Sequence, residues 1–131
     1  MKKHSILKCA GCGAVVEVLD ECSCGENCTF TCCGKEMTLM EPKTADTAKE
    51  KHVPVPSAQP SGETKVVVGS TLHPMLPEHH IEWIEIIDGP HTERQYLAPG
   101  GAPEALFHLK LKPGVTVREY CNIHGLWEVK I

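Results

Sequence analysis

The chain has 131 residues, of which 41% are hydrophobic and 23% are charged, in the usual range for a globular protein. Its formal net charge of −4 and pI near 6.0 argue against a nucleic acid or an anionic membrane as partner. No apolar run approaches the roughly 20 residues of a membrane span, and the start of the chain lacks an export signal. The sequence therefore predicts a cytoplasmic protein.

The eight cysteines are unevenly distributed, with seven between Cys9 and Cys33 and one, Cys121, near the other end. In the cytosol such a density indicates metal or redox chemistry more than structural disulfides. The pairs Cys9–Cys12 and Cys32–Cys33 are each followed by glycine and read as ligand-bearing turns. Residues 1–41 form a cysteine-rich segment too small to fold on a core alone, so we expect a metal-binding domain here.

The stretch from Pro42 to Pro60 is charged and proline-rich, which is typical of a flexible linker. From Lys65 onward, short runs rich in β-branched and aromatic residues alternate with glycine and proline turns. These runs predict strands at Lys65–Ser70, Ile81–Ile87, Glu93–Leu97, Ala105–Lys110, Val115–Tyr120 and Leu126–Ile131. Regularly spaced strands with no convincing helix predict a β-sandwich.

Several histidines fall where loops are expected to meet strands, and Cys121 lies three residues before His124. A thiolate and an imidazole are both good ligands for iron or zinc. The pair by itself is equally consistent with a buried cysteine beside an unrelated histidine.

Four motifs together resemble the superoxide reductase family. They are Lys49–Pro54, His73–Met75, His79 with Ile81–Glu85, and Tyr120–Trp127, in the family's order. The added Cys9–Cys12 and Cys32–Cys33 pairs resemble its two-domain form, desulfoferrodoxin. The resemblance implies an all-β protein: an immunoglobulin-like β-sandwich over residues 42–131, preceded by a small desulforedoxin-like metal-binding domain over residues 1–41.

The same resemblance implies one mononuclear iron that reduces superoxide to hydrogen peroxide. Its implied ligands are four imidazoles and one axial thiolate: His52, His73, His79, His124 and Cys121. His79 is preferred to His80 because it stands four residues before Trp83, as in the family pattern. The axial thiolate donates electron density through the metal toward the open position.

Glu50 and Lys51 directly precede His52. Taken alone, two charges in a proline-rich loop are most simply a solvated surface pair. The resemblance implies instead that Lys51 attracts superoxide and that Glu50 binds the oxidised iron at its sixth position.

The metal of the N-terminal domain is left open between three alternatives. The family form implies one iron bound by Cys9, Cys12, Cys32 and Cys33. Cys22, Cys24 and Cys28 are extra thiols between the two pairs, which also permit a [4Fe–4S] cluster, as in the methanoferrodoxin variant of the family. Paired cysteines are equally typical of a structural zinc site.

The resemblance further implies a rubredoxin-like electron donor, and the open edges of a sandwich favour a homodimer or higher homo-oligomer. The competing functional class is a non-catalytic metalloprotein, either an iron electron carrier or a zinc-ribbon module.

Overall fold

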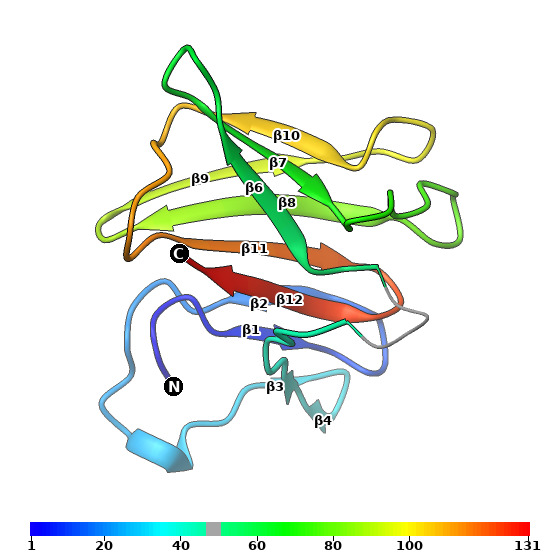
Figure 1. The fold of residues 1–131 in the computed structure, drawn as a ribbon. Helices are drawn as coiled ribbons and strands as arrows, with labels where there is room; N and C mark the ends of the chain where they lie inside the picture. The colour runs from blue at the N-terminus through cyan, green and yellow to red at the C-terminus, as the bar shows by residue number, and fades with distance from the viewer. Residues whose placement is uncertain (47–50) are drawn as a thin grey trace. The chain divides into compact units, whose positions relative to one another are not determined.

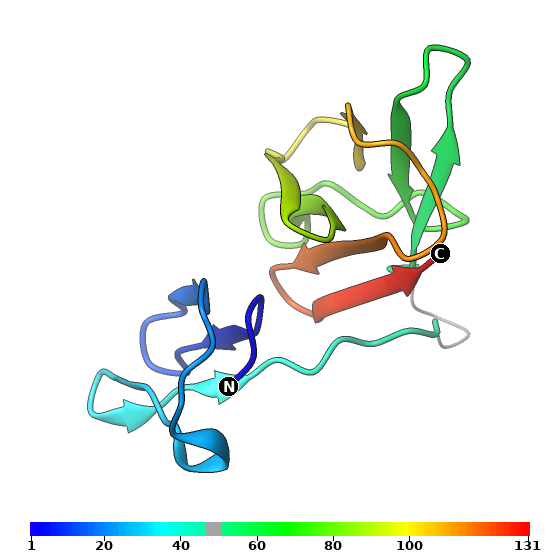
Figure 2. The same ribbon diagram turned by 90° about the vertical axis from the view of Figure 1, so that its left-hand side faces the viewer.

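The protein is described here from a computed structural model that covers residues 1–46 and 51–131. The chain divides into two compact units, Met1–Glu41 and Pro42–Ile131. The chain passes from the first unit to the second as the ribbon turns from cyan to green in Figures 1 and 2. Among the described residues, no helix has the length and apolar character needed to cross a membrane.

The first unit contains short antiparallel strands with a central strand β1 (Ile6–Lys8). β1 pairs on one side with β2 (Val15–Glu17) and on the other with β5 (Thr38–Leu39). A separate hairpin joins β3 (Thr31–Cys32) and β4 (Lys35–Glu36), and a 3₁₀ turn, η1, spans Gly25–Asn27. β2 contains the β-branched pair Val15 and Val16, which is typical of a strand.

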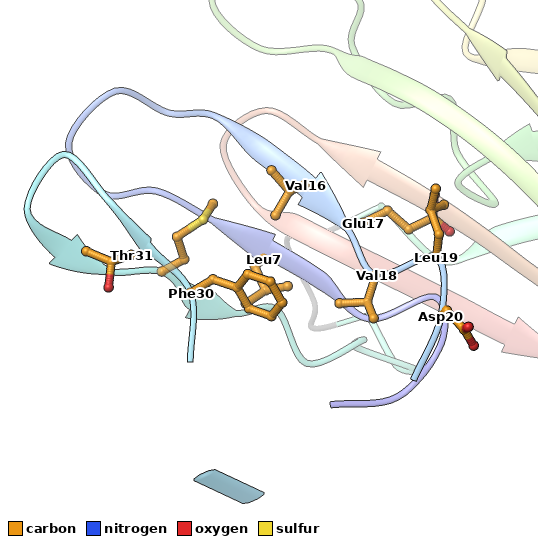
Figure 3. Close-up of a pocket in the computed structure, with 9 residues that line it drawn as sticks. Leu7, Val16, Glu17, Val18, Leu19, Asp20, Phe30 and Thr31 are labelled. Carbon is orange, nitrogen blue, oxygen red and sulfur yellow. The ribbon is translucent and has the colours of Figure 1, made fainter. Parts of the chain in front are cut away.

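The core of the first unit is small and consists of Leu7, Cys9, Val18 and Met37. Beside it lies a largely apolar pocket of about 400 Å³, which Leu7 and Phe30 line together with β2 (Figure 3). A unit of 41 residues with so few buried apolar side chains falls below the size at which a hydrophobic core alone usually suffices. Its fold therefore depends on what its cysteines bind.

The second unit is a sandwich of two antiparallel sheets, which confirms the predicted all-β class (Figure 1). One sheet has the order β10-β7-β6 and the other the order β12-β11-β8-β9. The strand bounds are β6 Pro54–Ala58, β7 Thr64–Val68, β8 Ile81–Asp88, β9 His91–Tyr96, β10 Glu104–Phe107, β11 Thr116–Cys121 and β12 Gly125–Lys130.

Strand β6 corrects the expectation of a flexible linker from Pro42 to Pro60. It pairs with β7 through the register Pro54↔Val68 to Ala58↔Thr64. Proline cannot donate a ladder hydrogen bond, so Pro54 and Pro56 argued against a strand in this stretch of the sequence. β6 is at the edge of its sheet, where a missing donor is tolerated, and this explains how Pro54 and Pro56 fit.

Alternating apolar side chains from the two sheets form the core between them. Val66 and Val68 of β7 are fully buried against Ile84 and Ile86 of β8, and Phe107 joins them from β10. Because the side-chain period of a strand is two, one face of each strand supplies the core. This packing fixes the strand ends, and with them the loops between strands.

Gly69 directly follows β7 and lets the backbone near Thr71 and the backbone of Lys51 approach it closely. Its φ is +81°, and an added Cβ would lie 2.2 Å from the Thr71 carbonyl oxygen and 2.5 Å from that of Lys51. Gly100 has a similar φ of +87°, but a Cβ there would meet no atom within 4 Å. The two glycines thus share a backbone conformation and differ in their surroundings.

We expect Gly69→Ala to lower both the stability and the metal content of the protein, because the clash displaces the carbonyl next to His52. Gly100→Ala should cost only the strain of a left-handed alanine, about 1 kcal/mol. Denaturant unfolding with metal analysis of both variants tests this difference. Equal effects of the two substitutions would contradict it.

Candidate metal centres

Three segments at one end of the sandwich bring five potential metal ligands together: the residues before β6, the β7–β8 loop, and the end of β11 with the β11–β12 turn. In Figure 1 this is the end where β6, β8 and β12 begin and where β7 and β11 finish. Antiparallel pairing of these strands carries their connecting loops to the same edge. The nitrogen and sulfur atoms that could bind a metal all lie within 4.8 Å of one another, on His52, His73, His79, Cys121 and His124.

The four imidazole rings form a closed ring of neighbours. The centroid distances between neighbours are 4.5 Å for His52–His73, 4.6 Å for His73–His79, 4.9 Å for His79–His124 and 4.6 Å for His124–His52. Across the ring, His52 and His79 are 6.1 Å apart. Four near-equal sides with a longer diagonal are the arrangement of four ligands around one ion in a plane.

The distances between ring nitrogens agree with this arrangement. His52 Nε2 is 3.0 Å from His73 Nε2 and 2.9 Å from His124 Nδ1. Imidazole bonds of about 2.1 Å at right angles place neighbouring donor atoms about 3 Å apart. His79 Nε2 is buried and has no hydrogen-bond partner among the described residues, as expected for an atom whose lone pair binds a metal.

The electrostatics favour neutral imidazoles. Burial first, and then the other histidines, lower the pKa of His52 to about 3. Burial is also the main cause that lowers the pKa of His73 to about 4, and it lowers that of His79. The Nδ1–H of His73 can donate to the Pro74 carbonyl oxygen at 2.7 Å, which leaves its Nε2 free to bind a metal.

Cys121 is fully buried at the end of β11, and burial raises the pKa of its thiol. The backbone N–H of His124 donates to its Sγ at 3.4 Å and opposes that rise. Metal coordination deprotonates a thiol outright. The site therefore combines four imidazole nitrogen donors with one sulfur that becomes a thiolate when a cation is bound.

Three residues that sequence analysis did not select support His52. The Asp46 carboxylate accepts the backbone N–H of His52 at 2.8 Å and that of Val53 at 3.1 Å. The Trp127 ring stacks on the His52 ring at 4.7 Å with an interplanar angle of 13°. Lys43 Nζ lies 4.8 Å from the Trp127 ring centre and donates to the His124 carbonyl at 3.2 Å. These contacts fix the orientation of the imidazole before a metal binds.

Asn122 supports His79 in the same way from the β11–β12 turn. Its Oδ1 accepts the backbone N–H of His80 at 2.9 Å, and its Nδ2 donates to the Glu78 carbonyl at 3.1 Å. One side chain thus holds the backbone on both sides of His79. The only sequence signal for this role was its position between Cys121 and His124.

Three further residues considered in the sequence analysis, His80, Lys51 and Glu50, are not among the five candidate ligands found in the described part of the chain. His80 turns away from the five ligands, with its Nδ1 3.1 Å from the Leu76 carbonyl oxygen. Lys51 is exposed, directly before the buried His52. Glu50 lies outside the described residues, so its predicted role as a ligand stays a prediction.

In the first unit, Cys9, Cys12, Cys32 and Cys33 bring their sulfurs within 4.8 Å of one another. Cys12 and Cys32 Sγ are 3.7 Å apart, and Cys32 and Cys33 Sγ are 3.9 Å apart. Metal–sulfur bonds of about 2.3 Å in a tetrahedron place sulfurs about 3.8 Å apart. The four sulfurs therefore have the spacing of ligands around a single ion.

The backbone of the first cysteine pair stabilises negative charge on sulfur. The N–H groups of Cys12 and Gly11 donate to Cys9 Sγ and lower the pKa of Cys9 to about 6. The neighbouring thiols, above all Cys9, raise the pKa of Cys32 to about 12. Several thiolates at this distance repel one another, so a bound cation is needed to hold all four.

Cys22, Cys24 and Cys28 form a separate group of three in the loop between β2 and β3. The sulfurs of this loop do not belong to the group of four, although both groups lie in the first unit. Sequence analysis had considered them as alternatives to the four paired cysteines.

Comparison with known proteins decides the family. The desulfoferrodoxin family model matches residues 44–130. A desulfoferrodoxin from Syntrophotalea carbinolica is 49% identical over 126 residues, which cover 96% of this chain and 95% of that protein. The chain belongs to the desulfoferrodoxin family.

Proteins with the name superoxide reductase are also similar to this chain. One from Pyrococcus abyssi is 36% identical and covers 68% of this chain and 92% of its own length. The crystal structure of the superoxide reductase from Treponema pallidum superposes with a TM-score of 0.76 and 28% identity, and covers 99% of this chain and 100% of that chain. The predicted family and the predicted fold class are both confirmed.

We expect Asn122→Ala to weaken metal binding, because it frees the backbone on both sides of His79. Loss of a group that orients a metal ligand typically costs 10- to 100-fold in affinity. Gln59→Ala is the matched control, since Gln59 is half-buried and its side-chain amide contacts Ser57, outside the metal-binding loops. The rate of metal loss to a chelator measures the effect, and equal rates for the two variants would contradict it.

Proposed function

We propose that the protein is a superoxide reductase, which reduces superoxide by one electron to hydrogen peroxide. The observation that carries this proposal is the ring of four imidazoles around the Cys121 thiol at the end of a β-sandwich. Similarity to superoxide reductases of P. abyssi and T. pallidum supports it.

A mononuclear iron fits the donor set. Imidazole and thiolate both suit iron, and the unpartnered His79 Nε2 and the lowered histidine pKa values agree with neutral nitrogen ligands. Bound iron would supply the electron for superoxide by cycling between its ferrous and ferric states. In sum, one superoxide takes up one electron and two protons and gives one hydrogen peroxide.

The protein's own groups have separate tasks in this reaction. The four neutral imidazoles add no charge, so a divalent iron with one thiolate keeps a net charge of +1, which attracts a small anion. Cys121 would hold the iron through its thiolate, which would raise electron density at the metal. We assign Lys51 to the attraction of superoxide and Glu50 to binding of the oxidised iron.

For the N-terminal centre we propose a single iron bound by Cys9, Cys12, Cys32 and Cys33. In a [4Fe–4S] cluster each thiolate binds a different iron, which separates the sulfurs more widely than around one ion. Sulfur distances of 3.7 and 3.9 Å therefore support one ion over a cluster. Zinc meets the same geometry, and Mössbauer and metal analysis of the purified protein would distinguish zinc from iron and from a cluster.

The wider assignments are also proposals. Residues 1–41 would act as an electron-relaying or stabilising domain and residues 42–131 as the catalytic domain. A rubredoxin-like protein in the cytoplasm would supply electrons. The unpaired edges of the strands β6 and β9 offer surfaces for a homodimer or higher homo-oligomer.

The alternative is a non-catalytic metalloprotein, either an iron electron carrier that does not react with superoxide or a zinc-ribbon module. Anaerobically reduced, iron-loaded protein should be oxidised by superoxide much faster than buffer controls, with formation of hydrogen peroxide. Iron-loaded protein that superoxide does not oxidise, or purified protein that holds only zinc, would support the alternative and overturn the proposal.

We expect Lys51→Met to lower the bimolecular rate constant with superoxide by about tenfold and to weaken its dependence on ionic strength. Lys110→Met is the matched control: it makes the same charge change near Gly62, at the end of the sandwich opposite to the site. Pulse radiolysis at several salt concentrations measures both effects. A Lys51→Met rate equal to that of the control would contradict the role of Lys51.

A further inference from the structure

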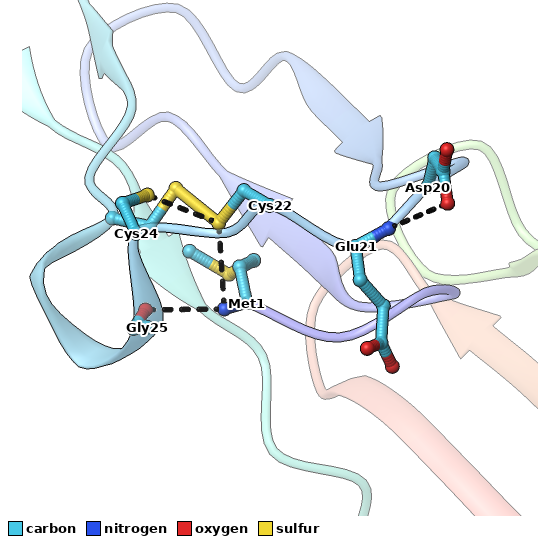
Figure 4. Close-up of a disulfide and its surroundings, with 7 residues drawn as sticks. Met1, Asp20, Glu21, Cys22, Cys24 and Gly25 are labelled. Carbon is cyan, nitrogen blue, oxygen red and sulfur yellow. Dashed lines mark hydrogen bonds between the residues drawn. A yellow bond between two sulfur atoms is a disulfide. The ribbon is translucent and has the colours of Figure 1, made fainter.

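Cys22, Cys24 and Cys28 lie on one short loop whose sulfurs converge (Figure 4). Their ligand atoms are all within 4.8 Å of one another, and Cys24 Sγ is 3.2 Å from Cys22 Sγ. The 3₁₀ turn Gly25–Asn27 reverses the chain after Cys24 and returns Cys28 to the other two. Neither the five-ligand site nor the group of four cysteines uses any of these sulfurs.

The structure joins Cys22 and Cys28 in a disulfide, with Cys24 as a free thiol beside it. The Cα atoms of Cys22 and Cys28 are 7.1 Å apart, whereas disulfides usually join Cα atoms about 4.4–6.8 Å apart. A metal ion between two sulfurs tolerates a wider separation, because it adds two metal–sulfur bonds of about 2.3 Å. The backbone spacing therefore leaves room for a shared ion in the reduced loop, whereas the disulfide joins Cα atoms that are farther apart than usual.

The chemistry of three thiolates narrows the class of ion. Thiolates select soft ions such as Cu(I) and Zn(II) over hard oxygen-binding ions such as Mg²⁺. Within the described part of the chain, no histidine, carboxylate or fourth cysteine joins this group. Three sulfurs complete a trigonal Cu(I) site, whereas Zn(II) would take a water molecule as its fourth ligand.

We propose that Cys22, Cys24 and Cys28 form a third metal site, which binds one soft cation when reduced and releases it on oxidation. With hydrogen peroxide as oxidant, Cys22 and Cys28 lose two electrons and form one disulfide. The peroxide O–O bond breaks, takes up these electrons and two protons, and gives two waters. Cys24 alone then cannot hold the ion.

The test uses the full-length reduced protein with its other sites already loaded with iron. Zn(II) and Cu(I) are added in separate anaerobic experiments, and bound metal is counted by native mass spectrometry. One additional equivalent of either ion is expected, and the ion that binds identifies the site's preference. No additional equivalent of either ion would overturn the proposal.

Substitutions in the loop test whether the additional ion binds to Cys22, Cys24 and Cys28. Cys24→Ser and Cys28→Ser should each weaken its binding at least tenfold, whereas Ser23→Ala, in the same loop, should leave it unchanged. The iron absorption of the group of four cysteines reports that the first unit remains folded. Undiminished binding in both cysteine variants would overturn the assignment.

Oxidation provides an independent readout. Added hydrogen peroxide should release the bound ion from the reduced protein with one Cys22–Cys28 disulfide formed per ion, as peptide mapping would detect. Cys28→Ala cannot form this disulfide, so any ion bound weakly to it should not be released in that proportion. Disulfide formation with the ion still bound would contradict the redox dependence.

Discussion

The convergence of five metal-binding side chains is the constraint on which the second unit depends. The Nε2 atoms of His52 and His73 are 3.0 Å apart, and burial is the main cause that lowers the pKa of both imidazoles, so protonation does not stabilise this pair. A shared cation satisfies all the donors at once. Because the candidate ligands come from three separate segments, metal binding and the order of those segments would be one equilibrium.

The first unit follows the same principle on a smaller scale. Its hydrophobic core is too small to stabilise 41 residues, and four sulfurs with tetrahedral spacing replace part of the missing apolar burial. The two units differ in what surrounds their cysteine sulfurs. Backbone N–H groups lower the pKa of Cys9, whereas burial raises that of Cys121, so the two kinds of thiolate depend on a bound metal to different degrees.

Strands with alternating β-branched residues could be predicted from the sequence, because the two-residue period of β7 and β8 is local information. β6 could not, since Pro54 and Pro56 argue against a strand unless its edge position is known. The five ligands emerged from a resemblance between motifs, because spacing alone did not distinguish Cys121 and His124 from a chance pair. Lys43 and Trp127 were missed because their contacts with His124 and His52 join residues far apart in sequence. Asp46 was missed because no motif marked it, although it is only six residues from His52.

The loop that leads into β6 changes character within one residue, from exposed Lys51 to buried His52. Two backbone contacts enforce this change. The Asp46 carboxylate holds the N–H of His52, and Gly69 leaves room for the carbonyl of Lys51. Because Asp46 and Gly69 both act on the backbone, they place position 51 next to His52 whatever side chain stands at position 51. In this sequence they therefore put the Lys51 cation beside a candidate metal ligand. The proposed substrate attraction and the metal site therefore share one structural support, although the two side chains act independently.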